Sequence, residues 1–168
     1  MTNLEHPAAP GSPLPYLDKA LPEAWTAASA FAAAVSQQTT LHGLTPAESE
    51  MVKVRVSQLN ECVFCLDLHS RQARKLGVPQ QKLDLLPAWR EATLFSDRER
   101  ALLEVAEIAT ELPLSEEGKE GLIAARDLLG EETFVSAEWV AASINMFNRI
   151  SILSEHAVRP RDAEGNLA

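Results

Sequence analysis

The same helix-start signal occurs twice in this sequence, and it constrains the fold more than any other feature. Thr45 is followed three residues later by Glu48, and Ser96 is followed three residues later by Glu99. In such a capping box each of the two side chains accepts a hydrogen bond from a backbone N–H group that has no partner within the helix. We therefore predict that helices begin directly after residues 45 and 96.

Further start and stop signals predict helices along most of the chain. Pro22 suits the first turn of an alanine-rich helix, and Asn60 can end the helix that follows Thr45 and cap the next one. That next helix should stop at Gly77-Val78-Pro79. The two remaining helices are framed by Ser115 and Gly130 and by residues 131 and about 155.

One segment, residues 51–56 (MVKVRV), alternates in the manner of a β-strand. We reject a strand here, because a single strand among helices would have no partner and the capping box directly before it predicts a helix. The expected fold is all-α, without internal repeats or a second domain. Its expected parts are an extended proline-rich arm (residues 1–22), a helical domain (23–158) and a flexible tail (159–168).

The composition narrows the class of protein. A chain of 168 residues with 46% hydrophobic side chains can bury a core without disulfides or metals. Its net charge of 15 − 24 = −9 argues against nucleic acid as a partner. No apolar run is long enough for a membrane span, and residues 1–15 do not resemble a signal peptide. We expect a cytoplasmic protein with no membrane partner.

Both cysteines lie within the eight residues from Cys62 to His69. On a helix, Cys62 and Cys65 would share a face, with their Cβ atoms about 5–6 Å apart, so a modest adjustment would allow a disulfide. Such a bridge closes a very short loop and adds little stability. In a reducing compartment we therefore predict a pair that alternates between dithiol and disulfide.

The neighbours of the two thiols favour different nucleophiles. His69 follows Cys65 by one helical turn and can act as its base, whereas Cys62 lies in the first turn, where the helix dipole stabilises a thiolate. We favour Cys65 as the attacking sulfur and Cys62 as the thiol that resolves its oxidised form. Glu50, on the preceding helix, is the candidate to orient His69.

Other interpretations of these residues remain open. The two cysteines could be small buried hydrophobic residues, and Glu50 could be a solvated helix residue. A zinc site is also possible by ligand type, with the ligands Cys62, Cys65, His69 and Glu50.

The remaining polar and aromatic candidates are expected to have structural roles or none. Asn145, Asn148 and Arg149 are expected to be packing or interface groups, and no role is assigned to His6, His42 or His156. Three aromatic residues are expected to fill the core or an interface: Trp89, Phe95 and Trp139.

Glu50, eleven intervening residues and the C-x-x-C-x-x-x-H pattern of Cys62, Cys65 and His69 resemble the AhpD-like alkylhydroperoxidases of the carboxymuconolactone decarboxylase superfamily. The segments LPAWREATLFSDRERALLEVAEIAT and INMFNRI also resemble members of this family. The resemblance covers roughly residues 41–153, which is most of the chain.

The resemblance implies an AhpD-like helical bundle that forms a homo-oligomer, commonly a trimer or hexamer. It also implies a peroxidase. We expect no cofactor and no metal. A thiolate would reduce a hydroperoxide, become a sulfenic acid and condense with its neighbour to a disulfide. A dithiol donor, either a lipoyl protein or a thioredoxin-like protein, would restore the pair.

Two departures from the family bear on the function. Phe64 stands where the best-studied branch carries a second histidine, which predicts a shorter proton relay. The true lactone decarboxylases lack the cysteine pair, so decarboxylation is not expected. The alternative function is a redox-sensing or interaction protein with the same fold and little turnover.

Overall fold

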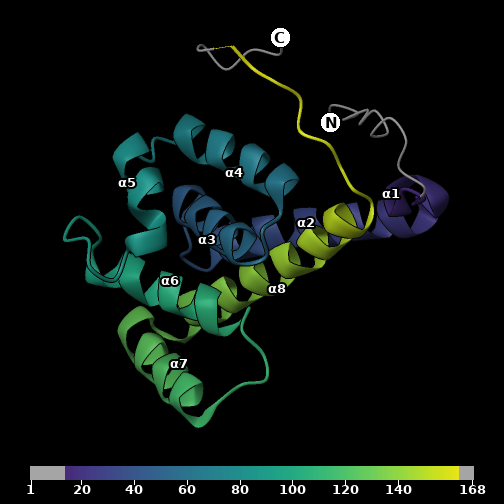
Figure 1. Ribbon diagram of the computed structural model, residues 1–168. Coiled ribbons are helices and arrows are strands. Elements are labelled where there is room, and N and C mark those ends of the chain that lie inside the picture. Colours follow the sequence, from purple (N-terminus) through teal and green to yellow (C-terminus); the bar gives the residue numbers. More distant parts are fainter. Residues whose placement is uncertain (1–13, 163–168) are drawn as a thin grey trace.

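The computed structural model describes residues 14–162, which form an all-α bundle (Figure 1). These residues contain eight α-helices, one 3-10 helix and no β-sheet, so the all-α prediction is confirmed. Within the same range, no helix combines the length and apolar character that a membrane span requires. The elements are α1 (Leu17–Ala20), α2 (Pro22–Leu41), α3 (Pro46–Leu59), α4 (Val63–Lys75), α5 (Gln80–Leu85), η1 (Leu86–Ala88), α6 (Asp97–Ile108), α7 (Glu116–Leu129) and α8 (Glu131–Leu153).

Both capping boxes form as predicted. The N–H of Glu48 donates to Thr45 Oγ1 at 3.2 Å, and the N–H of Thr45 donates to the Glu48 carboxylate at 2.9 Å. The equivalent bonds between Ser96 and Glu99 measure 3.2 and 2.8 Å. Residues 51–56 lie inside α3, so rejecting the strand was correct. Each box satisfies N–H groups that the first turn leaves without helical partners.

The turn between α3 and α4 differs from the prediction. Asn60 ends α3, but it does not cap α4; the N-cap of α4 is Cys62. Glu61 lies between them with φ 54°, in the left-handed region, and this reverses the chain over two residues. The Asn60 side-chain amide instead donates to asparagine side chains of α8. Cys62 is therefore at the helix end and not inside the helix.

The expected extended arm is wrong for residues 17–20, which form α1, while residues 1–13 lie outside the described part of the chain. The N–H of Leu17 donates to Ser154 Oγ at 3.0 Å and fastens α1 to the end of α8. Of the expected flexible tail, residues 163–168 lie outside the described part. Before them, Arg161 Nε lies 3.5 Å from a carboxylate oxygen of Asp67 on α4.

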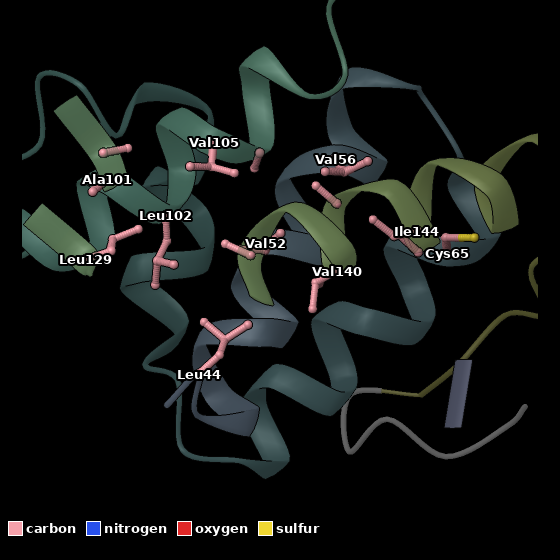
Figure 2. Close-up of a cluster of buried hydrophobic side chains, with 14 of the residues drawn as sticks. Leu44, Val52, Val56, Cys65, Ala101, Leu102, Val105, Leu129, Val140 and Ile144 are labelled. Atoms are coloured by element: carbon pink, nitrogen blue, oxygen red, sulfur yellow. The ribbon is translucent and has the colours of Figure 1, made fainter. Parts of the chain in front are cut away.

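Helix α3 lies at the centre of the bundle and packs against α4, α6 and α8. Val52 and Val56 on α3 contact an aliphatic cluster that includes Val140 and Ile144 of α8 (Figure 2). Cys65 lies at one end of this cluster, so the core itself excludes water from the thiol pair. Of the three aromatic residues expected in the core or an interface, Trp89 and Phe95 are buried and Trp139 is 53% exposed.

Candidate active site

Glu50 of α3 and His69 of α4 form a largely buried pair, and His69 lies one helical turn beyond Cys65. His69 Nδ1 lies 2.7 Å from one carboxylate oxygen of Glu50, and Lys53 Nζ lies 2.7 Å from the other. Burial raises the pKa of Glu50, but the hydrogen bond from His69 and the charge of Lys53 outweigh it, and the net pKa lies below the ordinary value. The carboxylate is therefore ionised at neutral pH.

The ionised carboxylate fixes the tautomer of His69. A carboxylate can only accept hydrogen bonds, so Nδ1 of His69 must carry the hydrogen and donate it. In the neutral ring, the lone pair is then on Nε2, which makes this nitrogen the base. The α3–α4 hairpin thus brings together Glu50 and His69, the two residues that sequence spacing nominated as orienting carboxylate and base.

The two cysteines lie at the start of α4 in the reduced form. Cys62 is the N-cap and Cys65 is in the first turn, and their side chains are hydrogen-bonded to each other. Both residues belong to the main core cluster, and only 1% and 3% of their surfaces are exposed. The pair is therefore close enough to exchange a proton and is shielded from bulk solvent.

The surroundings of the pair favour a thiolate at Cys62. The hydrogen bond from the Cys65 thiol is the largest cause, and with the N–H groups of Cys65 and Phe64 it outweighs burial and lowers the pKa of Cys62 to about 7. These N–H groups act without forming a formal side-chain cap hydrogen bond. The same thiol–thiol bond, together with burial and the charge on Cys62, raises the pKa of Cys65. The geometry thus supports Cys62 as the first thiol to ionise, whereas the sequence favoured Cys65.

A second histidine lies near Cys65, and sequence reasoning missed it. The Cys65 thiol donates to Ser151 Oγ at 3.6 Å, and Ser151 Oγ lies 3.3 Å from His156 Nδ1. His156 Nε2 lies 3.2 Å from a carboxylate oxygen of Asp18 on α1. Asp18 and His156 are 138 residues apart, so no local spacing could have associated them. The only sequence signal is that Ser151 and His156 are close together at the end of the last helix.

Asparagine side chains of α8 hold the α3–α4 turn in place. The Asn60 amide donates to the side-chain oxygens of Asn145 and Asn148, at 2.8 and 2.9 Å. Asn148 in turn donates to Ser57 Oγ at 3.1 Å. Asn148 is fully buried, and its side chain lowers the pKa of both cysteines. The packing role expected for these residues therefore includes positioning the turn that carries Cys62.

A cavity of about 90 Å³ is lined by His69 and Lys53 together with apolar residues that include Ile144 and Phe147. The volume suits a small molecule, because one water occupies about 30 Å³ of liquid. A larger groove of about 660 Å³ lies between α2 and α8, next to Phe31 and Trp139. Neither space is lined by a cysteine, and the smaller cavity is the one that His69 lines.

Among residues 14–162, no group of three or more histidine, cysteine or acidic side chains is arranged to hold a metal ion. The zinc interpretation of the cysteines, His69 and Glu50 therefore has no geometric support. His69 directs one nitrogen to Glu50, and the single thiol hydrogen of Cys65 can be donated either to Cys62 or to Ser151.

The helical bundle and the buried dithiol at a helix N-terminus define an all-α thiol protein. The chain belongs to the carboxymuconolactone decarboxylase family, whose model matches residues 20–107. The resemblance to AhpD-like members is thereby confirmed, because the structural relatives described next are also AhpD-like or peroxidase-related.

Two solved structures share the fold. One is a protein of unknown function from Agrobacterium tumefaciens, proposed to be the antioxidant defence protein AhpD, with 30% identity and a TM-score of 0.70 over 84% of this chain and 96% of that chain. The other is an uncharacterized peroxidase-related protein from Silicibacter sp. TM1040, with 25% identity and a TM-score of 0.55 over 98% of this chain and 93% of that chain.

Two curated relatives have no characterised function. The uncharacterized protein YdfG of Bacillus subtilis (strain 168) is 40% identical over 103 residues, which are 61% of this chain and 70% of YdfG. The uncharacterized protein YnjA of Escherichia coli (strain K12) is 37% identical over 70 residues, which are 42% of this chain and 38% of YnjA.

Proposed function

We propose that this protein is a thiol-dependent peroxidase of the AhpD-like type. The observation that carries the proposal is the position of Cys62 at the N-terminus of α4, where the Cys65 thiol can donate a hydrogen bond to it. The oriented His69–Glu50 pair lies one turn beyond Cys65. A thiolate, a neighbouring thiol and an oriented acid–base group are the components that peroxide reduction by cysteine requires. The similarity to an AhpD-type and a peroxidase-related protein supports the same class.

The first half of the cycle reduces the peroxide. Cys62 becomes a thiolate when its proton moves, by way of the Cys65 thiol, to His69. The Cys62 sulfur attacks the terminal oxygen of the hydroperoxide, the O–O bond breaks, and a Cys62 sulfenic acid forms. The departing alkoxide takes the proton from His69 and leaves as an alcohol. Glu50 stabilises the imidazolium form of His69 between these two events.

The second half closes and reopens the disulfide. Cys65 loses its proton and attacks the Cys62 sulfur, so the S–S bond forms and the sulfenic oxygen departs as hydroxide, which takes a proton from solvent. A dithiol donor, either a lipoyl protein or a thioredoxin-like protein, then attacks Cys62 and releases Cys65. Its second thiol releases Cys62 and leaves the donor as a disulfide. This donor chemistry belongs to a reducing cytoplasm.

A homo-oligomer, with a trimer or hexamer as the expected form, is the second part of the proposal. Val135 and Trp139 on α8 are 40% and 53% exposed and line the large apolar groove against α2. Burying these side chains against another copy of the chain would remove apolar surface from water. Light scattering should give a mass well above the 18.3 kDa of one chain, and a clean monomer at micromolar concentration would contradict it.

Steady-state consumption of cumene hydroperoxide with dihydrolipoamide tests the enzyme function. The wild-type protein should turn over, and both Cys62→Ser and Cys65→Ser should not. After one addition of peroxide, a sulfenic-acid probe should label Cys62 in Cys65→Ser and label nothing in Cys62→Ser. Labelling of Cys65 in Cys62→Ser, with none in the other variant, would make Cys65 the attacking sulfur.

The redox-sensing alternative predicts a different result in the same assay. The wild-type pair would be oxidised once by peroxide, but steady-state turnover with the dithiol would be absent. The proposal therefore requires repeated turnover, measured as many equivalents of peroxide consumed for each protein chain.

A further inference from the structure

We propose that Ser151, His156 and Asp18 form a second proton relay that removes the Cys65 proton as the disulfide forms and returns it when the disulfide is reduced. This inference rests on the proposed peroxidase function, and it assigns the two histidines to different steps. His69 accepts the proton of the first thiol to ionise, and His156 accepts the proton of the second.

The hydrogen-bond directions along the relay are determined by its carboxylate end. His156 Nε2 faces Asp18 Oδ1 at 3.2 Å, so an ionised Asp18 accepts a hydrogen from this nitrogen. His156 Nδ1 then has the lone pair, and it can accept the hydroxyl hydrogen of Ser151 across 3.3 Å. The Ser151 oxygen is in turn the acceptor for the Cys65 thiol at 3.6 Å. All three bonds therefore point toward removal of the Cys65 proton.

The relay is buried and held on several sides. His156 is 5% exposed and Ser151 is 7% exposed. The rings of Tyr16 and Phe64 contact the His156 ring edge to face, with centroids 5.0 and 5.3 Å away. Asp18 of α1 provides a negative charge against the same ring. A charged imidazole is costly to bury alone, so the Asp18 carboxylate stabilises the state in which His156 holds the proton.

The chemistry of Cys65 explains why a dedicated base is needed. The interaction with Cys62 and burial both raise the pKa of Cys65. Once Cys62 is a sulfenic acid the burial remains, so an adjacent proton acceptor assists the attack by Cys65. When Cys65 attacks the Cys62 sulfenic acid, its proton moves to Ser151 while the Ser151 proton moves to His156. When the donor dithiol later attacks Cys62 and breaks the S–S bond, Cys65 leaves as a thiolate and recovers that proton by the same route.

The arrangement also separates the two histidines by function. The thiol–hydroxyl hydrogen bond of Cys65 is to Ser151 on α8, while His69 faces Glu50 and the 90 Å³ cavity. His69 is thus placed to exchange a proton with a substrate oxygen in this cavity. Ser151 contacts the reacting sulfur directly. His156 acts on that sulfur only through Ser151, and is therefore a positioning residue.

The test follows the two oxidative steps separately in Ser151→Ala. We expect sulfenic acid to form at Cys62 at the wild-type rate, while disulfide formation slows by about 10²-fold, the lower end of the usual range for a lost acid–base group. Sulfenic acid should therefore accumulate and be trapped by a probe. Ser151→Thr keeps the hydroxyl and should restore resolution. Ser136→Ala, another buried serine of α8, is the matched control and should behave as wild type.

His156→Gln and Asp18→Asn extend the test to the far end of the relay. Both should accumulate sulfenic acid, and both should shift the pH dependence of disulfide formation, which a purely structural role would leave unchanged. Circular dichroism reports whether His156→Gln folds. If it does not fold, Ser151→Ala and its threonine rescue decide the matter. Disulfide formation at the wild-type rate in Ser151→Ala would overturn the relay.

A peroxide-free measurement separates failure of the relay from failure of the peroxidase function. The pair can be oxidised with diamide, and its reduction by dithiothreitol can be followed between pH 6 and pH 9. The relay predicts slower reduction in Ser151→Ala than in wild type. If wild type ignores peroxide but this difference is present, the peroxidase function fails and the relay stands. If peroxide is reduced and this difference is absent, the relay fails.

Discussion

His69 lies one helical turn beyond Cys65, and His156 is linked to Cys65 through Ser151. Both histidines face a carboxylate, but the chain builds their surroundings in different ways. His69 and Glu50 are 19 residues apart on the adjacent helices α3 and α4, and their contact is 2.7 Å long. His156 and Asp18 are 138 residues apart, and their contact of 3.2 Å exists only because α1 lies on the end of α8. The same histidine–carboxylate pair is thus formed twice: by neighbouring helices at His69, which we call the local side, and by long-range packing at His156, which we call the distant side.

This difference has consequences for stability. The local side is part of a hairpin whose turn is held by buried asparagines of α8. The distant side depends on α1, a four-residue helix without a buried residue of its own. Short elements with few buried contacts open more readily than core helices. We infer that partial opening would separate Asp18 from His156 before it separates Glu50 from His69.

The largest expected effect comes from removing the local histidine. His69→Ala should slow formation of the Cys62 sulfenic acid by about 10²–10⁴-fold, because the proton of the pair loses its acceptor and the alkoxide loses its donor. Rapid-mixing kinetics with a sulfenic-acid probe measures this step. His42→Ala is the matched control, since His42 is half exposed and pairs with Glu132. A wild-type rate in His69→Ala would show that His69 does not act in the peroxide step, and the proposed division of roles between His69 and His156 would fail.

Glu50→Gln should act on the same step but more weakly, because Glu50 works through His69. The amide keeps the shape of the carboxylate but not its charge, so both the tautomer and the imidazolium form of His69 lose support. The same rapid-mixing assay should give a rate between those of wild type and His69→Ala. A slower rate than in His69→Ala would mean that Glu50 has a separate role.

Asn148→Ala tests the structure that the two sides share. Its removal takes one hydrogen-bond partner from Asn60 and one from Ser57 inside the core, so the free energy of unfolding should fall by about 1–3 kcal/mol. Urea denaturation measures this loss. Gln81→Ala is the exposed amide control and should change stability by less than about 0.5 kcal/mol. Equal stabilities would show that the asparagine network does not hold the turn.

The smallest expected effect is a shift in the ionisation of Cys62. Alkylation of Cys62 should accelerate as pH rises through about 7, because only the thiolate reacts and the Cys65 thiol stabilises it. Cys65→Ala removes that bond, so the inflection should move upward by about one unit, toward the unperturbed value of about 8.5. Cys65→Ser keeps a donor and should shift less. An unchanged inflection in Cys65→Ala would exclude the thiol–thiol bond as the cause.

Much of the fold could be predicted from the sequence, because its signals act over a few residues. The capping boxes at Thr45 and Ser96 and the glycine stops at Gly77 and Gly130 mark helix ends through bonds and backbone angles within one turn. The turn at Asn60 was predicted less well. The left-handed backbone of Glu61 moves the N-cap of α4 to Cys62, and a glutamate gives no sequence signal for that conformation.

The sequence by itself determined that the chain is helical, that Glu50 meets His69, and that the two cysteines lie one and two turns before His69, because helical spacing and one short turn set these positions. Only the tertiary structure decided how the site is divided. The position of Cys62 at the helix end favours it as the thiolate, and the packing of α1 on α8 adds Ser151, His156 and Asp18. The physical reason is that capping and periodicity are local interactions, whereas a contact across 138 residues forms only when the whole bundle packs.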